Sequence, residues 1–350
     1  MAGVRFSAPR QINEWCRKIR HSKTKFYFYD QGSEVCIVIQ INKKPVSYET
    51  GFLFATIARM QLWFWAAVTG MVLAGISNFG FKIAAKKGFD ADVFILYSGV
   101  VSVVFAGAGL LILRPDGVVT LLLVVITVIA GGVAAQGGSL KIVALRYIDT
   151  TIFFPLFKLL SPFLAVLAGL IFFGERFTAL EWFGIALGHL VPLLLISKVE
   201  NKRQNNLLMG LVMVLVVSGT SALAAALNKY VIDLGMSEWE ALWYSSWGIF
   251  IASLVMISLK FRTLPWRYIT EHTTKDLLKA SIFRSILICL SLLLVLYAYG
   301  HGGDLGIVQT IHGLYIVIPI VLAVLIYKEH IDWKKVLAVI LCIVSLLFLG

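Results

Sequence analysis

The sequence has little charge and few cysteines. Only 14% of its 350 residues are Asp, Glu, Lys or Arg, whereas 59% are hydrophobic and the mean hydropathy is +0.87. This composition excludes an ordinary soluble protein and is typical of proteins that cross a membrane several times. The cysteines lack the spacing of a metal site or a disulfide framework, so no metal or other cofactor is expected. They are Cys16, Cys36, Cys289 and Cys342.

Acidic residues are missing from the middle of every long apolar run. Those of the membrane part lie near run ends, as Asp92, Asp233 and Glu240 do. An intramembrane carboxylate is the usual binding group of exporters of cationic drugs, so the sequence disfavours that class. The net charge of +12 does not indicate nucleic-acid binding either. Most positive residues lie between apolar runs, where they orient a membrane protein.

Ten apolar runs follow Met60, each close to the length that a helix needs to cross ~30 Å of hydrocarbon. They cover residues 62–84, 91–113, 118–145, 150–173, 178–197, 207–229, 239–260, 280–300, 305–327 and 332–349. The connection at 262–280 is long enough for an interfacial amphipathic helix. The predicted fold class is all-α, a polytopic membrane protein with ten transmembrane helices.

The first 59 residues do not share this pattern. They contain no apolar run of 18 residues, and they lack the parts of a signal peptide. Two interpretations compete: a cytoplasmic extension, or translated sequence upstream of a start at Met60. In either case we expect residues 1–59 to be an N-terminal tail outside the membrane fold.

The two halves of the membrane part repeat one another. Lys82, Gly88, Tyr97 and Ser98 recur 147 residues later as Lys229, Gly235, Tyr244 and Ser245, and Glu175 recurs 154 residues later as Glu329. Each half, residues 60–198 and 207–350, holds five predicted spans. An odd number of spans reverses the direction of the second half, which gives the inverted repeat characteristic of secondary transporters, with substrate bound near the midplane.

Lys158 is the leading candidate for a binding residue. It lies about eight residues into the fourth span, roughly 12 Å deep at ~1.5 Å per residue. A lysine at that depth should face a bundle interior or a wet cavity, although a structural partner could also neutralise it. The second offset aligns Lys158 with His312, which shares a helical face with Gln309. The sequence predicts that Lys158 and His312 together bind an anionic group.

Further polar residues complete the predicted substrate site: Gln309, Gln136, Asn78, Asn228, Tyr97 and Tyr244. Each has a structural alternative, such as packing in the glycine-rich run around Gln136. Lys141, Arg146 and Arg284 lie close enough to a boundary for their charges to reach water. Glu175 and Arg176 are expected at the water interface between the fourth and fifth spans.

Ten spans in two halves, the K-x5-G-x8-YS element of each half and the motif GERFT at 174–178 resemble the EamA-type branch of the drug/metabolite transporter superfamily. The resemblance covers residues 60–350, although the second half has KEHID at 328–332 in place of GERFT. It implies a basket of ten helices, with spans 1–4 and 6–9 around a central cavity and spans 5 and 10 peripheral. It also implies alternating-access transport of amino acids or other small metabolites, often as export.

The predicted function is therefore a secondary transporter of a small carboxylate-bearing metabolite, with export as the expected direction. A membrane-embedded lipid-modifying enzyme and a non-transporting membrane protein are the alternatives. The expected partners are the substrate and the lipid bilayer, with no nucleic acid, and the protein is expected to be a monomer or homodimer in a bacterial inner membrane. Loops after odd-numbered spans carry most Lys and Arg residues, which predicts that these loops are cytoplasmic. The ten positive residues of the tail favour the opposite orientation.

Overall fold

The computed structural model divides the chain into two compact units, Met1–Gln61 and Leu62–Gly350. It describes residues 30–31, 34–35, 62–144, 147–148, 150–195, 207–261, 265–319, 321–322 and 332–350. In the first unit, β1 (Asp30–Gln31) pairs with β2 (Glu34–Val35) in an antiparallel ladder. The rest of the predicted tail, the 198–206 connection and Glu329 lie outside the described residues.

The second unit is helical, which confirms the predicted all-α class for its described part. Its helices are α3 (Leu62–Lys86), α4 (Ala91–Leu113), α5 (Leu121–Ala144), α6 (Thr150–Ala168), α7 (Ala179–Leu194), α8 (Leu207–Asp233), α9 (Glu238–Phe261), α10 (Pro265–His272), α11 (Lys275–Gly300), α12 (Leu305–Gly313) and α14 (Trp333–Leu349). A π-helical turn, η1 (Gly169–Phe173), extends α6, and a 3₁₀ turn, η2 (Leu314–Ile316), follows α12. Each helix except α10 overlaps a predicted span, and α3, α8, α9 and α11 extend beyond theirs.

Six of these helices are long and apolar enough to cross a membrane, by length and composition: α4, α5, α6 with η1, α8, α9 and α11. Three shorter apolar helical segments, at 62–78, 179–194 and 305–319, accompany them among the described residues. Large side chains cover their outer surfaces, and Leu111, Leu121 and Phe172 are 79%, 81% and 79% exposed. Because water would disfavour so much apolar surface, the outer faces suit a lipid environment. The helical unit is thus an integral, multi-pass membrane protein.

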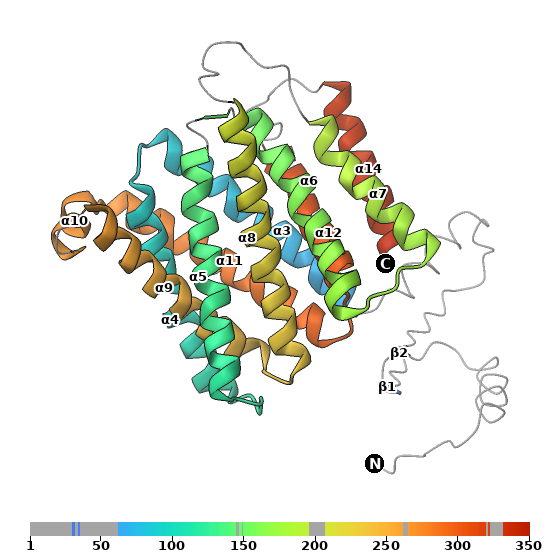
Figure 1. The fold of residues 1–350 in the computed structure, drawn as a ribbon, viewed down its shortest axis with the longest axis horizontal. Coiled ribbons are helices and arrows are strands. Elements are labelled where there is room, and N and C mark those ends of the chain that lie inside the picture. The colour runs from blue at the N-terminus through green and yellow to red at the C-terminus, as the bar shows by residue number, and fades with distance from the viewer. Residues whose placement is uncertain are drawn as a thin grey trace, which may run out of the picture. The chain divides into compact units, whose positions relative to one another are not determined.

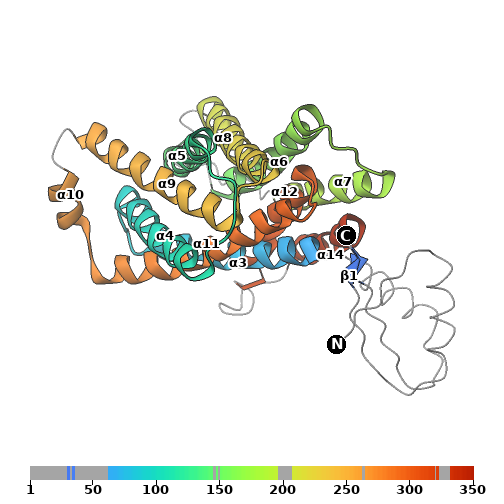
Figure 2. The same cartoon turned by 90° about the horizontal axis from the view of Figure 1, so that it is seen from below.

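The helices of the second unit pack in pairs that are far apart in sequence. α3 packs on α11, α5 on α8 and α9, α4 on α9 and α11, and α6 on α8 and α12. α9 thereby contacts both α4 and α5, while α12 contacts both α3 and α6. The pair α7–α14 lies at one flank of this unit and α10 at the opposite flank (Figures 1 and 2).

The helix α6 departs from regular α geometry in ways that follow from its sequence. Pro155 and Pro162 lie inside it, and each removes a backbone N–H donor. At its end the chain widens into the turn η1 and stops at Gly174, whose φ of 65° favours glycine. The helix α7 then begins with a capping box in which Thr178 and Glu181 each bond the other's backbone N–H.

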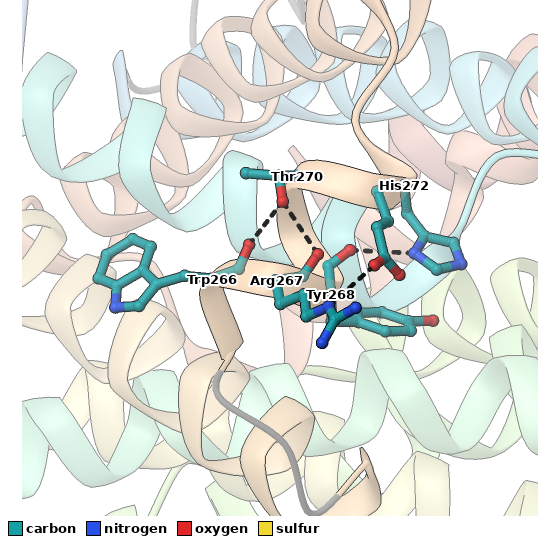
Figure 3. Close-up of polar contacts among 6 residues, drawn as sticks. Trp266, Arg267, Tyr268, Thr270 and His272 are labelled. Carbon is teal, nitrogen blue, oxygen red and sulfur yellow. Dashed lines mark hydrogen bonds and ion pairs between the residues drawn. The ribbon is translucent and has the colours of Figure 1, made fainter.

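The short helix α10 lies in the long connection, where the sequence left room for an interfacial helix. Its polar side chains bond mostly to its own backbone: Thr270 Oγ1 donates to the carbonyl of Trp266 at 3.0 Å, and a ring nitrogen of His272 lies 2.9 Å from the carbonyl of Tyr268 (Figure 3). The Tyr268 hydroxyl donates to Asp90 Oδ2 at 2.7 Å, which attaches α10 to the start of α4. Trp266 is 71% exposed, as expected of an aromatic residue at a membrane surface.

Candidate functional site

Lys158 is buried in the helical unit, as predicted. Only 8% of the residue is exposed, and its Nζ lies 3.8 Å from the ring centroid of Tyr315 and 4.8 Å from that of Phe157. Both distances are within the range of a cation–π interaction, which contributes about 2 kcal/mol or more when the pair is desolvated. The lysine therefore lies between two aromatic rings from α6 and from η2.

The structure also brings His312 to this place. A β-carbon on Gly313 would lie 2.7 Å from Cγ of Pro162 and 3.7 Å from the carbonyl oxygen of Lys158, so α12 crosses α6 at the turn that holds the lysine. The imidazole of His312 packs edge-on against the ring of Tyr315, with centroids 5.6 Å apart. Lys158 and His312 thus contact the same tyrosine, and His312 is within electrostatic reach of Lys158.

Two further basic residues belong to this cluster, and sequence reasoning placed both at the membrane boundary. Nζ of Lys141, from α5, lies 4.3 Å from the centroid of Phe157, the ring that Lys158 also contacts. Arg284, from α11, donates from Nη1 to Ser98 Oγ at 3.3 Å and is within electrostatic reach of Lys141. In the structure Arg284 lies nine residues inside α11, or roughly 13 Å, because the helix begins at Lys275, before the predicted span at 280–300.

We call Lys141, Lys158, Arg284 and His312 the basic cluster; its members come from four different helices. Neither lysine has an acidic partner in the described segments, where every ion pair lies elsewhere. Burying an ion costs several kcal/mol even after relaxation, and cation–π contacts offset only part of that cost. An anion bound among these groups would offset the rest, so the cluster is suited to hold one.

Three other predicted residues make polar contacts or lie buried. Gln309 donates from Nε2 to the hydroxyl of Tyr299 at 2.6 Å, and Asn78 donates to the carbonyl of Ala74, one turn back on α3, at 2.7 Å. Asn228 is 8% exposed, and its Oδ1 has no hydrogen-bond partner in the described part. These placements do not test a binding role, which stays a prediction.

The remaining three predicted residues lie elsewhere. Gln136 is exposed on the face of α5 that also carries Val125 and Ile129, both of which point outward. The hydroxyl of Tyr97 is 3.0 Å from that of Thr273, near the start of α11. Tyr244 is half-buried and packs against the neighbouring Trp243. No hydrogen bond or ring contact among the described residues links them to Lys158.

Glu175 and Arg176 both lie in the turn between η1 and α7, where Glu175 is buried and Arg176 is exposed. Glu175 is 8% exposed and its carboxylate accepts hydrogen bonds from the backbone N–H groups of Leu305 and Gly306, the latter at 3.1 Å. It thereby caps the first turn of α12. Burial raises the pKa of Glu175 above its ordinary value of 4.5, although these two hydrogen bonds oppose the shift.

Other charged groups surround this cap. Nζ of Lys229 forms an ion pair with Asp233 at 3.2 Å and lies 5.5 Å from the ring of Phe173. Burial also raises the pKa of Asp304, the residue before α12. In the described segments, no group of three or more His, Cys, Asp or Glu residues could hold a metal ion.

Comparison with known proteins agrees with a helical membrane transporter. Residues 208–350 match the EamA-like transporter family. A solved structure titled "Crystal structure of protein" is similar over 82% of this chain and 97% of its own, with a TM-score of 0.63 and 12% identity, which shows the fold alone. No curated protein matches.

The class defined by these observations is a multi-pass helical membrane protein. Within it, residues 208–350 are similar to the EamA-like transporter family, which is part of the drug/metabolite transporter superfamily. The match confirms the sequence-based resemblance over residues 208–350.

Proposed function

We propose that this protein is a secondary transporter that moves a small carboxylate-bearing metabolite by alternating access, in the export direction, across a bacterial inner membrane. The observation that carries this proposal is the burial of Lys158 beside His312, where α6 crosses α12, without an acidic partner in the described segments. A charge-assisted hydrogen bond from such a group to a carboxylate contributes roughly 1.5–3 kcal/mol.

The helix packing supports an inverted repeat of residues 62–195 and 207–350. Exchanging the halves replaces α3, α4, α5, α6 and α7 by α8, α9, α11, α12 and α14. The pair α3–α11 then becomes α8–α5, α5–α9 becomes α11–α4, and α6–α8 becomes α12–α3; all of these pairs are in contact. The pairs α4–α9, α6–α12 and α7–α14 map onto themselves. A pseudo-two-fold axis between the halves accounts for this pattern, and it passes beside the crossing of α6 and α12.

Transport in proteoliposomes tests this function. The purified protein should move at least one member of a panel of amino acids and organic anions, and Lys158→Met should weaken substrate affinity about ten- to a hundredfold. Methionine keeps the length of the side chain but removes its charge. His312→Phe should weaken affinity less than Lys158→Met does, because it removes a hydrogen-bonding ring and not a lysine charge.

The matched control is Lys334→Met, the same substitution at an exposed lysine of α14. It should transport like the parent protein. Normal affinity in a well-folded Lys158→Met protein would mean that the lysine is structural, and no transport of any panel member would favour a membrane-embedded enzyme or a non-transporting protein.

A further inference from the structure

Lys141 and Lys158 lie against the same aromatic ring. Their Nζ atoms are 4.3 Å and 4.8 Å from the ring centroid of Phe157, so the two nitrogens cannot be farther apart than the sum of these distances. Lys141 comes from α5 and is also within electrostatic reach of His312, the partner of Lys158 in the proposed function. Because each oxygen of a carboxylate accepts hydrogen bonds and a lysine ammonium moves on a flexible four-carbon stem, one carboxylate can contact both lysines.

In the described segments, the charged groups around the two lysines are basic. Lys141 is the charged neighbour of Lys158, and both lysines are charged neighbours of His312. Arg284 is the charged neighbour of Lys141. No ion pair of the described residues includes either lysine. A carboxylate bound to the lysines therefore has cations around it, and no acidic side chain of the described part lies beside it.

The aromatic rings at this place already hold the lysine ammonium groups. Nζ of Lys158 lies 3.8 Å from the ring centroid of Tyr315, and the ring of Phe157 is within cation–π distance of both lysines. An ammonium group of a ligand would need a carboxylate or an aromatic face of its own. Beside these lysines it would instead meet two like charges, which disfavours binding.

We infer that the substrate is a small organic acid without an ammonium group beside its carboxylate, and that Lys141 joins Lys158 in binding this carboxylate. This inference rests on the proposed function and makes it more specific, because it disfavours α-amino acids. In an α-amino acid the ammonium group and the carboxylate share one carbon atom, so the ammonium would lie next to the lysines whenever the carboxylate is bound. His312 needs no charge in this arrangement, because a neutral imidazole still donates one hydrogen bond.

Equilibrium binding to the purified full-length protein, at neutral pH and constant ionic strength, tests this inference. The probes are three matched pairs, in each of which the second member differs from the first by one α-ammonium group: 4-methylpentanoate and leucine, 3-phenylpropanoate and phenylalanine, and succinate and aspartate. In every pair that binds, the acid without the ammonium group should bind at least about tenfold more tightly than the amino acid.

Variants of Lys141 separate a binding role from a structural one. Lys141→Met should weaken binding of the preferred acid about tenfold and reduce the preference for that acid over its amino acid, because one of the two repelling charges is gone. Lys141→Gln should act likewise, so a folding defect in one variant does not prevent the test. Lys141→Arg keeps the charge and should keep the preference. Lys158→Met should weaken the binding of every probe, and Lys334→Met should change none.

Three results would overturn the inference. Amino acids that bind as tightly as their matched acids, with the affinity lost in Lys158→Met, would show a carboxylate site that accepts an ammonium group, and the proposed function would stand. Unchanged affinity and preference in well-folded Lys141→Met and Lys141→Gln would remove Lys141 from the site and leave the proposed function intact. Absence of binding by all six probes would also overturn the inference, and together with absence of transport of any panel member it would remove the proposed function.

Discussion

Glu175 shows how one buried carboxylate can connect two segments of the helical unit. Its oxygens accept the N–H groups of Leu305 and Gly306, and they fold back over Gly169, where any β-carbon would collide with them. The glycine of η1 and the glutamate of the GERFT motif therefore act together to hold the start of α12. The role of the motif's glutamate in this structure is therefore to cap a helix.

Replacing Glu175 should change stability in a pH-dependent way. Because burial raises its pKa above 4.5 in the folded protein, the folded state keeps a proton that the unfolded chain has already released. The contribution of Glu175 to stability is present below the unfolded pKa and is lost as pH rises through the folded pKa. Glu175→Gln does not titrate, so its Tm relative to the parent protein should increase from about pH 4 to pH 7.

Thermal unfolding in detergent across that pH range measures the difference. Asp304 also has a raised pKa and is present in both proteins, and its negative charge contributes to the raised pKa of Glu175. Glu175→Ala leaves two N–H groups of α12 without acceptors and should lower stability by about 1–2 kcal/mol. A Tm difference between Glu175→Gln and the parent that stays constant with pH would contradict the assignment.

Single residues differed in how well the sequence predicted them. Lys158 was predictable because it is alone in an apolar span and shares a face with small residues. Lys141 and Arg284 were not, because a long side chain near a helix end can reach either water or the interior, and only packing decides. Tyr315 and Phe157 had no sequence signal, since aromatic residues in membrane helices occur on every face.

The crossing of α6 and α12 depends on a glycine. A β-carbon on Gly313 would lie 2.7 Å from Cγ of Pro162, whose ring cannot rotate away because it is fixed to the backbone of α6. Gly313→Ala should force the helices apart, lower stability by about 1–3 kcal/mol, and weaken anion binding because Lys158 and His312 move relative to one another.

Gly219 in α8 provides the matched control, because nothing lies within 4 Å of the position that its β-carbon would occupy. Gly219→Ala should leave Tm unchanged or raise it, since alanine is favoured over glycine by about 1 kcal/mol in a helix. Thermal unfolding and anion binding of the two variants, measured side by side, decide the matter. Equal Tm values would show that α6 and α12 tolerate a wider separation.

At the level of elements, hydropathy predicted where the helices lie but not where they change geometry. The run 91–113 coincides with α4 because turns bound it on both sides. The π turn at Gly169–Phe173 and the 3₁₀ turn at Leu314–Ile316 were not predicted, because both remain apolar and hydropathy does not distinguish i→i+3 from i→i+5 bonding. The first turn lies beside Glu175, and the second contains Tyr315.

At the scale of the whole molecule, two contacts between loops indicate which loops share a side of the membrane. Nζ of Lys87, after α3, forms an ion pair with Asp276, at the start of α11, at 2.8 Å. The N–H of Val118, after α4, donates to the carbonyl of Gly235, after α8, at 2.9 Å. Both contacts join loops that an alternating ten-span topology places on the same side of the membrane. Which of the two sides faces the cytoplasm then depends on the charges of the loops.

The loop charges predict that the side with Lys87 and Asp276 is cytoplasmic in a chain that begins at Met60. Single cysteines at Lys275 and Arg114, both exposed and predicted on opposite sides, test this once Cys16 and Cys36 are absent; Cys289 and Cys342 are buried. An impermeant maleimide should label Arg114→Cys in intact cells and label Lys275→Cys only after permeabilisation. The reverse pattern would contradict the loop count. The same pair in the full-length chain then measures whether the tail, with ten positive residues of its own, reverses the orientation.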